Sequence, residues 1–274
     1  MSASVNLPGR DYYDGPELAD RVFAELAGAG LDTTALDVDD LAALDEFHAL
    51  GRAATVALAE RSGLHAGIRV LDAGAGIGGP ARFLASRYGA EVLALDATER
   101  FCRVNERLCA ATGLSTRVRV LCADATRLPC DCAGFDLAWT QALIQSVPDK
   151  AALLKELRRV LIPGGRLSMY EVLRSSEEPL HYPVPWADGP EQSFLVSAGE
   201  LREELDRAGF AVLEWLTGAE AAAAVGAAAS SVPAPEHDVD LSLLMPDYEA
   251  RMSGVARNVA EGRIELAMAV LEAP

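Results

Sequence analysis

From Gly67 onward, short apolar runs alternate with longer segments in which apolar residues recur at helical spacing. The runs predict strands, and the segments between them predict amphipathic helices. The expected strands span residues 68–74, 91–97, 117–125, 135–141, 165–173, 211–217 and 264–272. Strands and helices that alternate in this way form parallel β-α-β units, with helices on both faces of one sheet. The pattern therefore predicts an α/β fold with a Rossmann-like, doubly wound sheet.

The helix expected after the fourth strand has clear boundary signals. Four leucines recur at helical spacing between positions 153 and 161, and Asp149 precedes them as a good N-cap. The run Pro163-Gly164-Gly165 is expected to stop this helix before the next strand. The last two strands are joined by a long insertion, so we expect them to close the sheet as an antiparallel edge.

Three segments fall outside this alternation of strands and helices. Residues 1–66 predict an N-terminal helical cover. Residues 174–197 are rich in proline, and residues 218–262 begin with an alanine run that is typical of a helix or a linker. We expect the chain to consist of this cover and a core, 67–274, in which 174–197 and 218–262 are lid segments. Ligands of such sheets bind at the carboxyl ends of the strands, where lids close.

The stretch VLDAGAGIGGP, residues 70–80, follows the first expected strand directly. Glycine has no Cβ and adopts positive φ, so this turn lets a flat ligand lie against the main chain. Asp72, Asp96 and Asp124 lie at the ends of three consecutive strands. A carboxylate at Asp72 repels a diphosphate but suits a cationic amine, Asp96 lies where an acid accepts both ribose hydroxyls, and Asp124 suits the adenine amine. The pattern indicates a phosphate-free nucleoside with an amino group, such as S-adenosylmethionine.

The composition limits the partners. The 274 residues carry a net charge of −17, which argues against nucleic acid or an anionic membrane as partner. No apolar run approaches the ~20 residues of a membrane span. The first residues lack a basic region followed by an apolar run, so we expect no signal peptide and a cytoplasmic location. The five cysteines have no metal-ligand spacing and predict reduced thiols and no metal site.

Five stretches, in order, resemble the successive motifs of class I S-adenosylmethionine-dependent methyltransferases. They are VLDAGAGIGG, EVLALDAT, RVLCADATRLP, FDLAWTQALIQSVPDK and LRRVLIPGGRLSMYEV, which lie within residues 68–172. The stretches DYYDG, DEFHALGRAAT and YPVPWA resemble the small-molecule branch around the sarcosine/dimethylglycine, tocopherol-type and natural-product methyltransferases. This resemblance implies a seven-stranded sheet whose last strand is antiparallel, and S-adenosylmethionine as the cofactor.

The resemblance also implies the cofactor contacts. The loop backbone would face the methionine end, Asp96 the ribose, and Asp124 with the amide of Ala125 the adenine. Gln141, at the end of the fourth strand, would lie near the sulfonium, whereas Asp136 at the opposite edge is structural. The residues implied at the cofactor are Asp72, Ala73, Gly74, Gly76, Asp96, Ala97, Asp124, Ala125 and Gln141.

Methyl transfer from a sulfonium is an in-line displacement, so the protein supplies alignment and excludes water. A base is needed only where the acceptor must lose a proton. Many relatives place a histidine shortly after the fourth strand, but residues 142–146 have no ionisable side chain here. His48 and Glu171 are therefore the candidate catalytic groups. Tyr13 and Trp139 are candidate substrate contacts, because aromatic faces can hold a cationic amine.

The leading hypothesis is methyl transfer to a small-molecule acceptor, either a natural product or an amine-like metabolite. The alternative is a natural-product cyclase that binds S-adenosylmethionine without transferring its methyl group, since one fold supports several chemistries. A nicotinamide-dependent oxidoreductase needs a phosphate-tolerant loop and a hydride-site pair, and neither is found. A non-enzymatic binding module would leave the lids without a reaction to enclose. The acceptor, the methylated atom, the base and the oligomeric state stay open.

Overall fold

The computed structural model describes residues 18–232, 237 and 239–274. In this part of the chain seven strands form one sheet, in the order β3-β2-β1-β4-β5-β7-β6. The strands are β1 (Arg69–Ala73), β2 (Glu91–Asp96), β3 (Val118–Cys122), β4 (Phe135–Gln141), β5 (Leu161–Arg174), β6 (Ala211–Thr217) and β7 (Ile264–Ala273). The pairs from β3 to β5 are parallel, whereas β7 runs antiparallel to both β5 and β6. The expected seven-stranded sheet with an antiparallel last strand is confirmed.

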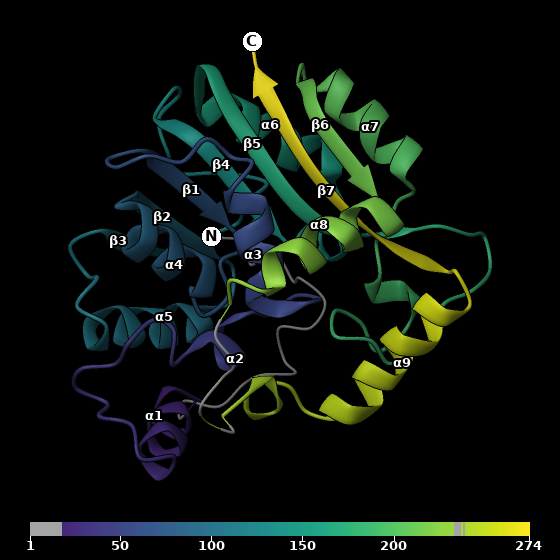
Figure 1. Cartoon of the computed structure of the whole chain (residues 1–274). Coiled ribbons are helices and arrows are strands. Elements are labelled where there is room, and N and C mark those ends of the chain that lie inside the picture. The colour runs from purple at the N-terminus through teal and green to yellow at the C-terminus, as the bar shows by residue number, and fades with distance from the viewer. Residues whose placement is uncertain (1–17, 233–236, 238) are drawn as a thin grey trace, which may run out of the picture.

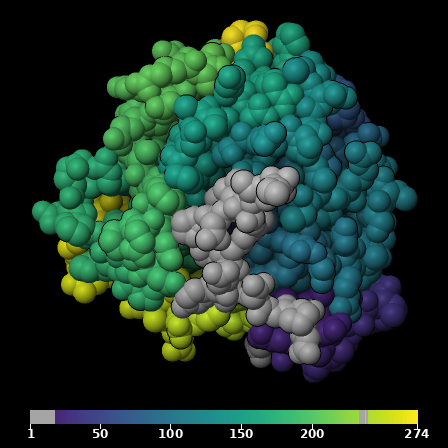
Figure 2. Space-filling model, turned by 180° about the vertical axis from the view of Figure 1, so that it is seen from behind, coloured from purple at the N-terminus to yellow at the C-terminus, as the bar shows by residue number. Residues whose placement is uncertain are grey.

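Helices cover both faces of the sheet (Figure 1). On one face α3, α4 and α8 pack against Val70 and Trp139, and on the other α6 and α7 pack against Leu71 and Met169. Figure 2 shows this second face, with α6 in teal and α7 in green. The helices are α1 (Leu18–Gly28), α2 (Ala42–Asp45), α3 (Gly51–Ala59), α4 (Gly79–Tyr88), α5 (Glu99–Ala111), α6 (Lys150–Val160), α7 (Ala198–Arg207), α8 (Ala219–Ala229) and α9 (Tyr248–Ala260).

Each face of the sheet has its own hydrophobic core, and successive residues of a strand belong to the two cores in turn. In β4, Trp139 belongs to the core under α3 and α4, whereas Ala138 belongs to the core under α6. In β5, Tyr170 belongs to the first core and Met169 to the second. Successive side chains of a strand point to opposite faces. This alternation decides on which face each candidate site residue lies.

A third core joins the N-terminal helices to α5. Val22 and Leu26 of α1 and Leu44 of α2 are buried in one cluster with Val104 and Leu108. Figure 1 shows α1, α2 and α9 beyond the sheet edge opposite to the C-terminus. Because β7 is antiparallel to β5, that edge is where the parallel strands end. These helices therefore border the edge at which ligands of doubly wound sheets bind.

The start of α6 follows the sequence expectation, but its end does not. The Asp149 carboxylate accepts a hydrogen bond from the amide of Ala152 at 2.8 Å, as an N-cap does. The helix ends at Val160 and β5 begins at once, so the expectation that Pro163-Gly164-Gly165 separates them is wrong. Proline disfavours helical backbone in the residue before it, which ends the helix earlier. The turn-forming Gly164, with φ of 75°, lies inside the irregular start of β5.

The proline-rich segment, residues 174–197, is held near its middle and near its end. The buried Arg251 guanidinium on α9 donates to the carbonyl of Val184 at 2.7 Å. Near the end of the segment, the amide of Phe194 donates to the carbonyl of Gln145 at 2.9 Å, and the Lys150 ammonium donates to the carbonyl of Phe194. The segment thus joins α9 to the loop that follows β4. Among the residues that the structure describes, no helix combines the length and apolarity needed to cross a membrane.

Candidate active site

The glycine-rich loop is tied to the end of β2. The amides of Gly74 and Ala75 both donate to the carbonyl of Leu95, at 2.8 and 2.9 Å. The amide of Gly76 donates to Asp96 Oδ2 at 2.9 Å, and Asp96 Oδ1 accepts from the amide of Thr98 at 2.8 Å. Gly76 has a φ of 55°, and a Cβ added there would meet no atom within 4 Å. The loop and the carboxylate form one unit with open space beside Gly76.

Asp72 lies beneath the start of α4 and is 2% exposed. The amide of Ala81 donates to this carboxylate, which anchors the helix that follows the loop. Its second oxygen, Oδ2, has no hydrogen-bond partner among the described residues. Burial, together with the charges of Asp96 and Glu46, raises the pKa of Asp72 to about 8. A cationic group at this position would relieve that cost, because an opposite charge favours the ionised carboxyl.

The raised pKa of Asp72 predicts a pH-dependent stability. The unfolded chain ionises this carboxyl near pH 4 and the folded chain near pH 8, so the stabilisation is present below about pH 4 and is lost as pH rises to about 8. Between about pH 5 and about pH 8, Asp72 should lower the free energy of unfolding by on the order of 3 kcal/mol. Urea unfolding of wild type and Asp72→Asn at both pH values isolates this contribution. Equal pH dependence in the two proteins would contradict it.

Asp124 follows β3, at the neighbouring strand end. Its Oδ1 accepts hydrogen bonds from the amide and the hydroxyl of Thr126, at 2.8 and 2.7 Å. This local turn holds the carboxylate in place beside the buried Ala125. Since β1, β2 and β3 are neighbours in the sheet, the structure brings the loop, Asp96 and Asp124 to one edge. Ala73 ends β1 as a buried residue, and Ala97 follows β2 directly.

Gln141 and Trp139 lie on one face at the end of β4. Both are buried, at 8% and 0% exposed, and the Trp139 indole Nε1 donates to Gln141 Oε1 at 2.9 Å. Trp139 packs within the core under α3 and α4. The structure thus places Trp139 beneath Gln141 rather than at an accessible surface. Tyr13, the other candidate substrate contact, lies outside the described residues.

His48 belongs to a buried polar cluster in the segment between α2 and α3. Its Nε2 lies 2.7 Å from Glu46 Oε2 and 3.1 Å from the Thr55 hydroxyl. Glu46 also accepts from the Arg52 guanidinium and from the Thr55 hydroxyl. The positive charge of Arg52 and the hydrogen bond from His48 outweigh the effect of burial and lower the pKa of Glu46 to about 2. Glu46 is therefore a fixed anion that orients the imidazole, as carboxylates orient catalytic histidines.

Glu171 lies on β5 and is 1% exposed. Its Oε2 accepts hydrogen bonds from the amides of Leu143 and Ile144, at 2.9 and 3.0 Å, so it holds the loop after β4. Oε1 has no hydrogen-bond partner among the described residues. Burial raises the pKa of Glu171 to about 7, against the nearby Thr140 hydroxyl and these two amides, which favour the carboxylate.

The two candidate catalytic groups lie on different faces of the sheet. The His48 ring packs edge-on against Tyr170, with centroids 5.7 Å apart, on the face of α3 and α4. Glu171 is the next residue of the strand and points to the other face, with Met169 and Leu173. The structure therefore does not bring His48 and Glu171 together in one contact.

A buried ion network around α2 escaped sequence reasoning. Arg82, which is 0% exposed, donates to Asp45 Oδ1 at 2.5 Å, and the guanidinium of Arg52 binds both Glu46 and, at 3.8 Å, Asp45. The network docks the N-terminal cover onto the start of α4. The one signal in the sequence was a charged cluster, Asp45-Glu46 with Arg52, within a segment otherwise expected to pack by apolar contacts.

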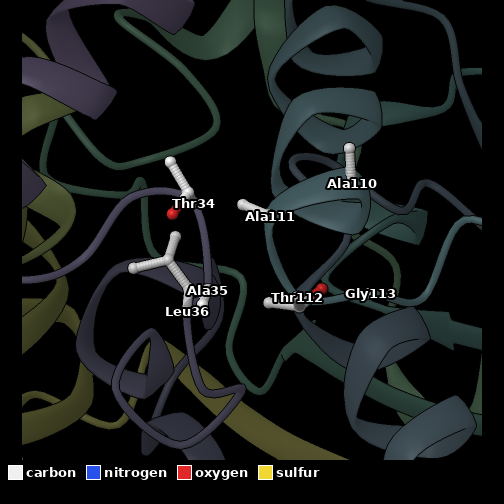
Figure 3. Close-up of a pocket in the computed structure, with 7 residues that line it drawn as sticks. All are labelled: Thr34, Ala35, Leu36, Ala110, Ala111, Thr112 and Gly113. Carbon is white, nitrogen blue, oxygen red and sulfur yellow. The ribbon is translucent and has the colours of Figure 1, made fainter.

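One surface pocket lies away from this site (Figure 3). It has a volume of about 320 Å³ and lies between the segment before α2 and the end of α5, as Figure 3 shows. Its lining residues are Thr34, Ala35, Leu36, Ala110, Ala111, Thr112 and Gly113. None of these side chains ionises, so the pocket offers no catalytic group. Among the described residues, no cluster of three or more His, Cys, Asp or Glu is placed to hold a metal ion.

Comparison with known proteins agrees with this geometry. Residues 71–169 match the family described as "Methyltransferase domain". Methyltransferase GfsG of Streptomyces halstedii is 34% identical over 164 residues, which are 60% of this chain and 57% of that protein. The chain thus spans little more than half the length of this relative.

Solved structures share the fold. Geranyl diphosphate C-methyltransferase from Streptomyces coelicolor A3(2), in complex with Mg²⁺, geranyl-S-thiolodiphosphate and S-adenosyl-L-homocysteine, matches with a TM-score of 0.68. The match covers 99% of this chain and 100% of that chain at 14% identity. The [4+2]-cyclase SpnF matches with a TM-score of 0.62 over 80% of both chains at 24% identity. At these identities the likeness establishes the fold and not the reaction.

Proposed function

We propose that this chain, whose residues 71–169 match the family described as "Methyltransferase domain", is a class I methyltransferase that transfers a methyl group from S-adenosylmethionine to a small-molecule acceptor. The observation that carries the proposal is the joined unit of loop and Asp96, with open space at Gly76 and no cationic side chain in the loop. Backbone and carboxylates of this kind suit a phosphate-free adenosine with a positive tail.

The residues that we propose at the cofactor belong to four neighbouring strand ends. Asp96 would accept from the ribose hydroxyls, Asp124 from the adenine amine, and the unpartnered oxygen of Asp72 would lie toward the cationic tail. When bound, S-adenosylmethionine supplies a methyl group on a positively charged sulfur, and its transfer leaves neutral S-adenosylhomocysteine. The full proposed set is Asp72, Ala73, Gly74, Gly76, Asp96, Ala97, Asp124, Ala125 and Gln141.

For an acceptor that must lose a proton, we propose His48 as the base. With Nε2–H donating to Glu46, the proton would be taken at Nδ1, which lies 3.3 Å from the carbonyl of Ala49. The protonated Nδ1 could then donate to that carbonyl, and Glu46 would balance the new charge. Glu171, on the other face of the sheet, would position the loop after β4, and its Oε1 would be a second group able to accept a proton.

A cyclase remains the second candidate, favoured by the likeness to SpnF and by the absence of an ionisable side chain at 142–146. The two candidates differ in whether the cofactor is consumed. The chain would be incubated with S-adenosylmethionine carrying a labelled methyl group and with small phenols, enols and secondary amines. Labelled product together with S-adenosylhomocysteine supports the transferase, whereas a changed acceptor with intact S-adenosylmethionine supports the cyclase.

Gly76→Ala tests the proposed cradle. We expect binding of S-adenosylmethionine to weaken more than about tenfold, because the added Cβ would occupy the open space beside the loop. Titration calorimetry measures the binding. Gly113→Ala is a matched control, because Gly113 also has a positive φ of 70° and no atom within 4 Å of an added Cβ. Both variants should lose about 1 kcal/mol of stability, and equal affinity in the two would refute the cradle.

A further inference from the structure

Two buried side chains, one at the end of β4 and one opposite it on β5, have polar atoms without a partner among the described residues. Gln141 is 8% exposed and Tyr170 is 1% exposed. Neither Gln141 Nε2 nor the Tyr170 hydroxyl meets a hydrogen-bond partner in the described part of the chain. An unsatisfied buried polar group destabilises the folded protein, so two of them side by side call for an explanation.

The amide orientation of Gln141 follows from its neighbours. The indole N–H of Trp139 can only donate, and it lies 2.9 Å from Gln141 Oε1. Oε1 also lies 3.2 Å from the Thr55 hydroxyl. The oxygen must therefore face Trp139, and the unpartnered end of the side chain is the NH₂ group. Gln141 thus presents hydrogen-bond donors and no free acceptor.

Tyr170 presents its hydroxyl on the same face. Gln141 and Tyr170 are direct partners in the parallel pairing of β4 and β5, so their side chains lie on one side of the sheet. His48 joins them, because its ring packs against Tyr170 and its Nε2 lies 3.1 Å from the Thr55 hydroxyl. Burial raises the pKa of Tyr170, so its hydroxyl stays protonated and can donate.

The sheet order places this donor pair at the end of the row of proposed cofactor contacts: Gln141 on β4 is the last of them, near the sulfonium, and Tyr170 lies one strand farther. The loop, Asp96 and Asp124 follow β1, β2 and β3, whereas β4 and β5 lie on the other side of β1. At about 4.8 Å between strands, Tyr170 lies roughly 10 Å across the sheet from β1. The pair therefore lies toward the part of the sheet edge that the cofactor would not occupy. The methyl acceptor would bind there.

We propose that Gln141 and Tyr170 together bind an oxygen atom of the methyl acceptor, either an ionised hydroxyl or a carbonyl. This inference rests on the proposed function and narrows its substrate class to phenols, enols and related oxygen compounds. Two neutral donors stabilise a negative or partly negative oxygen, as oxyanion sites do. An amine N–H at the same position would face the NH₂ group of Gln141, and only the Tyr170 hydroxyl could accept from it.

A matched pair of coloured probes tests the inference. 4-Nitrophenolate and 4-nitroaniline have the same size and differ in the group offered to the site, which is a negatively charged oxygen in the first and a neutral NH₂ group in the second. Absorbance titrations would use the full chain saturated with S-adenosylhomocysteine, at an alkaline pH at which the phenol is ionised. We expect the phenolate to bind at least about tenfold tighter than the aniline. Equal binding, or no binding of either probe, overturns the inference.

Two variants locate the effect. Tyr170→Phe should weaken the phenolate about tenfold without lowering the melting temperature, because the hydroxyl has no partner to lose. Gln141→Glu keeps an oxygen for Trp139 but replaces the donor, so it should remove the preference for phenolate. For Tyr170→Phe the Kd of S-adenosylhomocysteine should stay within about threefold of wild type. Gln141→Glu changes a proposed cofactor contact, so it is judged only by the ratio of phenolate to aniline binding. Tyr88→Phe, at the far end of α4, is the control, which should change neither the binding of phenolate nor that of S-adenosylhomocysteine.

The remaining outcomes are decisive against the inference. If a variant bound S-adenosylhomocysteine more weakly but bound phenolate unchanged, the two donors would belong to the cofactor carboxylate. Unchanged binding of both ligands in both variants would mean that the donors meet only water. Failure of the wild-type chain to bind S-adenosylhomocysteine at all would instead refute the proposed function, which keeps the two failures apart.

Discussion

Asp96→Ala is expected to weaken the binding of S-adenosylmethionine more than about 100-fold, because two contributions are lost at once. The carboxylate would no longer accept from the ribose hydroxyls that we propose it binds. It would also no longer hold the amide of Gly76, at 2.9 Å, and the amide of Thr98, at 2.8 Å, so the loop would lose its tie to β2. Titration calorimetry on the full chain measures the loss directly.

A second substitution separates the two contributions. Asp96→Asn keeps one oxygen for a backbone amide but removes the charge, and it should bind between wild type and Asp96→Ala. Asp149→Ala is the control, since it removes an exposed N-cap on α6 at a cost of about 1 kcal/mol and leaves the loop intact. A folded Asp96→Ala protein that binds as tightly as the Asp149→Ala control would refute the assigned role.

Arg82→Met is expected to lower the free energy of unfolding by about 3–5 kcal/mol, because it removes the hydrogen-bonded partner of the buried Asp45 carboxyl and leaves only the more distant Arg52, at 3.8 Å. Both groups of the pair are inaccessible, with side-chain exposures of 0%. Burial raises the pKa of Asp45, and the charge of Arg82 is the largest effect that opposes the rise. Urea unfolding at neutral pH, followed by far-ultraviolet circular dichroism, measures the change.

The pairing can be tested by removing both charges. Arg82→Met combined with Asp45→Leu should recover much of the loss, because an apolar pair leaves no buried charge. Arg103→Met is the surface control: its bridge to Glu99 is exposed and should contribute less than about 1 kcal/mol. A loss of that small size for Arg82→Met would show that the network does not hold the cover onto α4.

The buried ion network around α2 also holds the candidate base, His48, in place. Arg52 stabilises Glu46 as an anion, and Glu46 orients His48. The same cover rests on Arg82 through Asp45. Substitutions that loosen the cover should therefore disturb the acceptor side of the proposed site before they disturb the cofactor side. Separate measurement of cofactor binding and acceptor binding distinguishes the two.

Local signals in the sequence determined most of the element boundaries. The strands expected at 135–141 and 211–217 match the structure at both ends, and Asp149 caps α6 as its position predicts. Such features depend on residues within a few positions of one another, so a short window contains the whole cause. The antiparallel last strand of the sheet was predicted from the family resemblance as well as from the chain itself. The carboxylates Asp72, Asp96 and Asp124 were likewise visible as residues at strand ends.

Tertiary structure alone decided which of these residues meet. Arg82 and Asp45 are 37 positions apart, and Thr55 and Gln141 are 86 apart, so no local pattern reveals either contact. The pairing of β4 with β5 put Gln141 beside Tyr170 and turned Glu171 to the opposite face from His48. A carboxylate, an amide or a hydroxyl is chemically the same in every sequence. Its partners and its exposure to water, which set its pKa and its use, arise only when distant segments pack together.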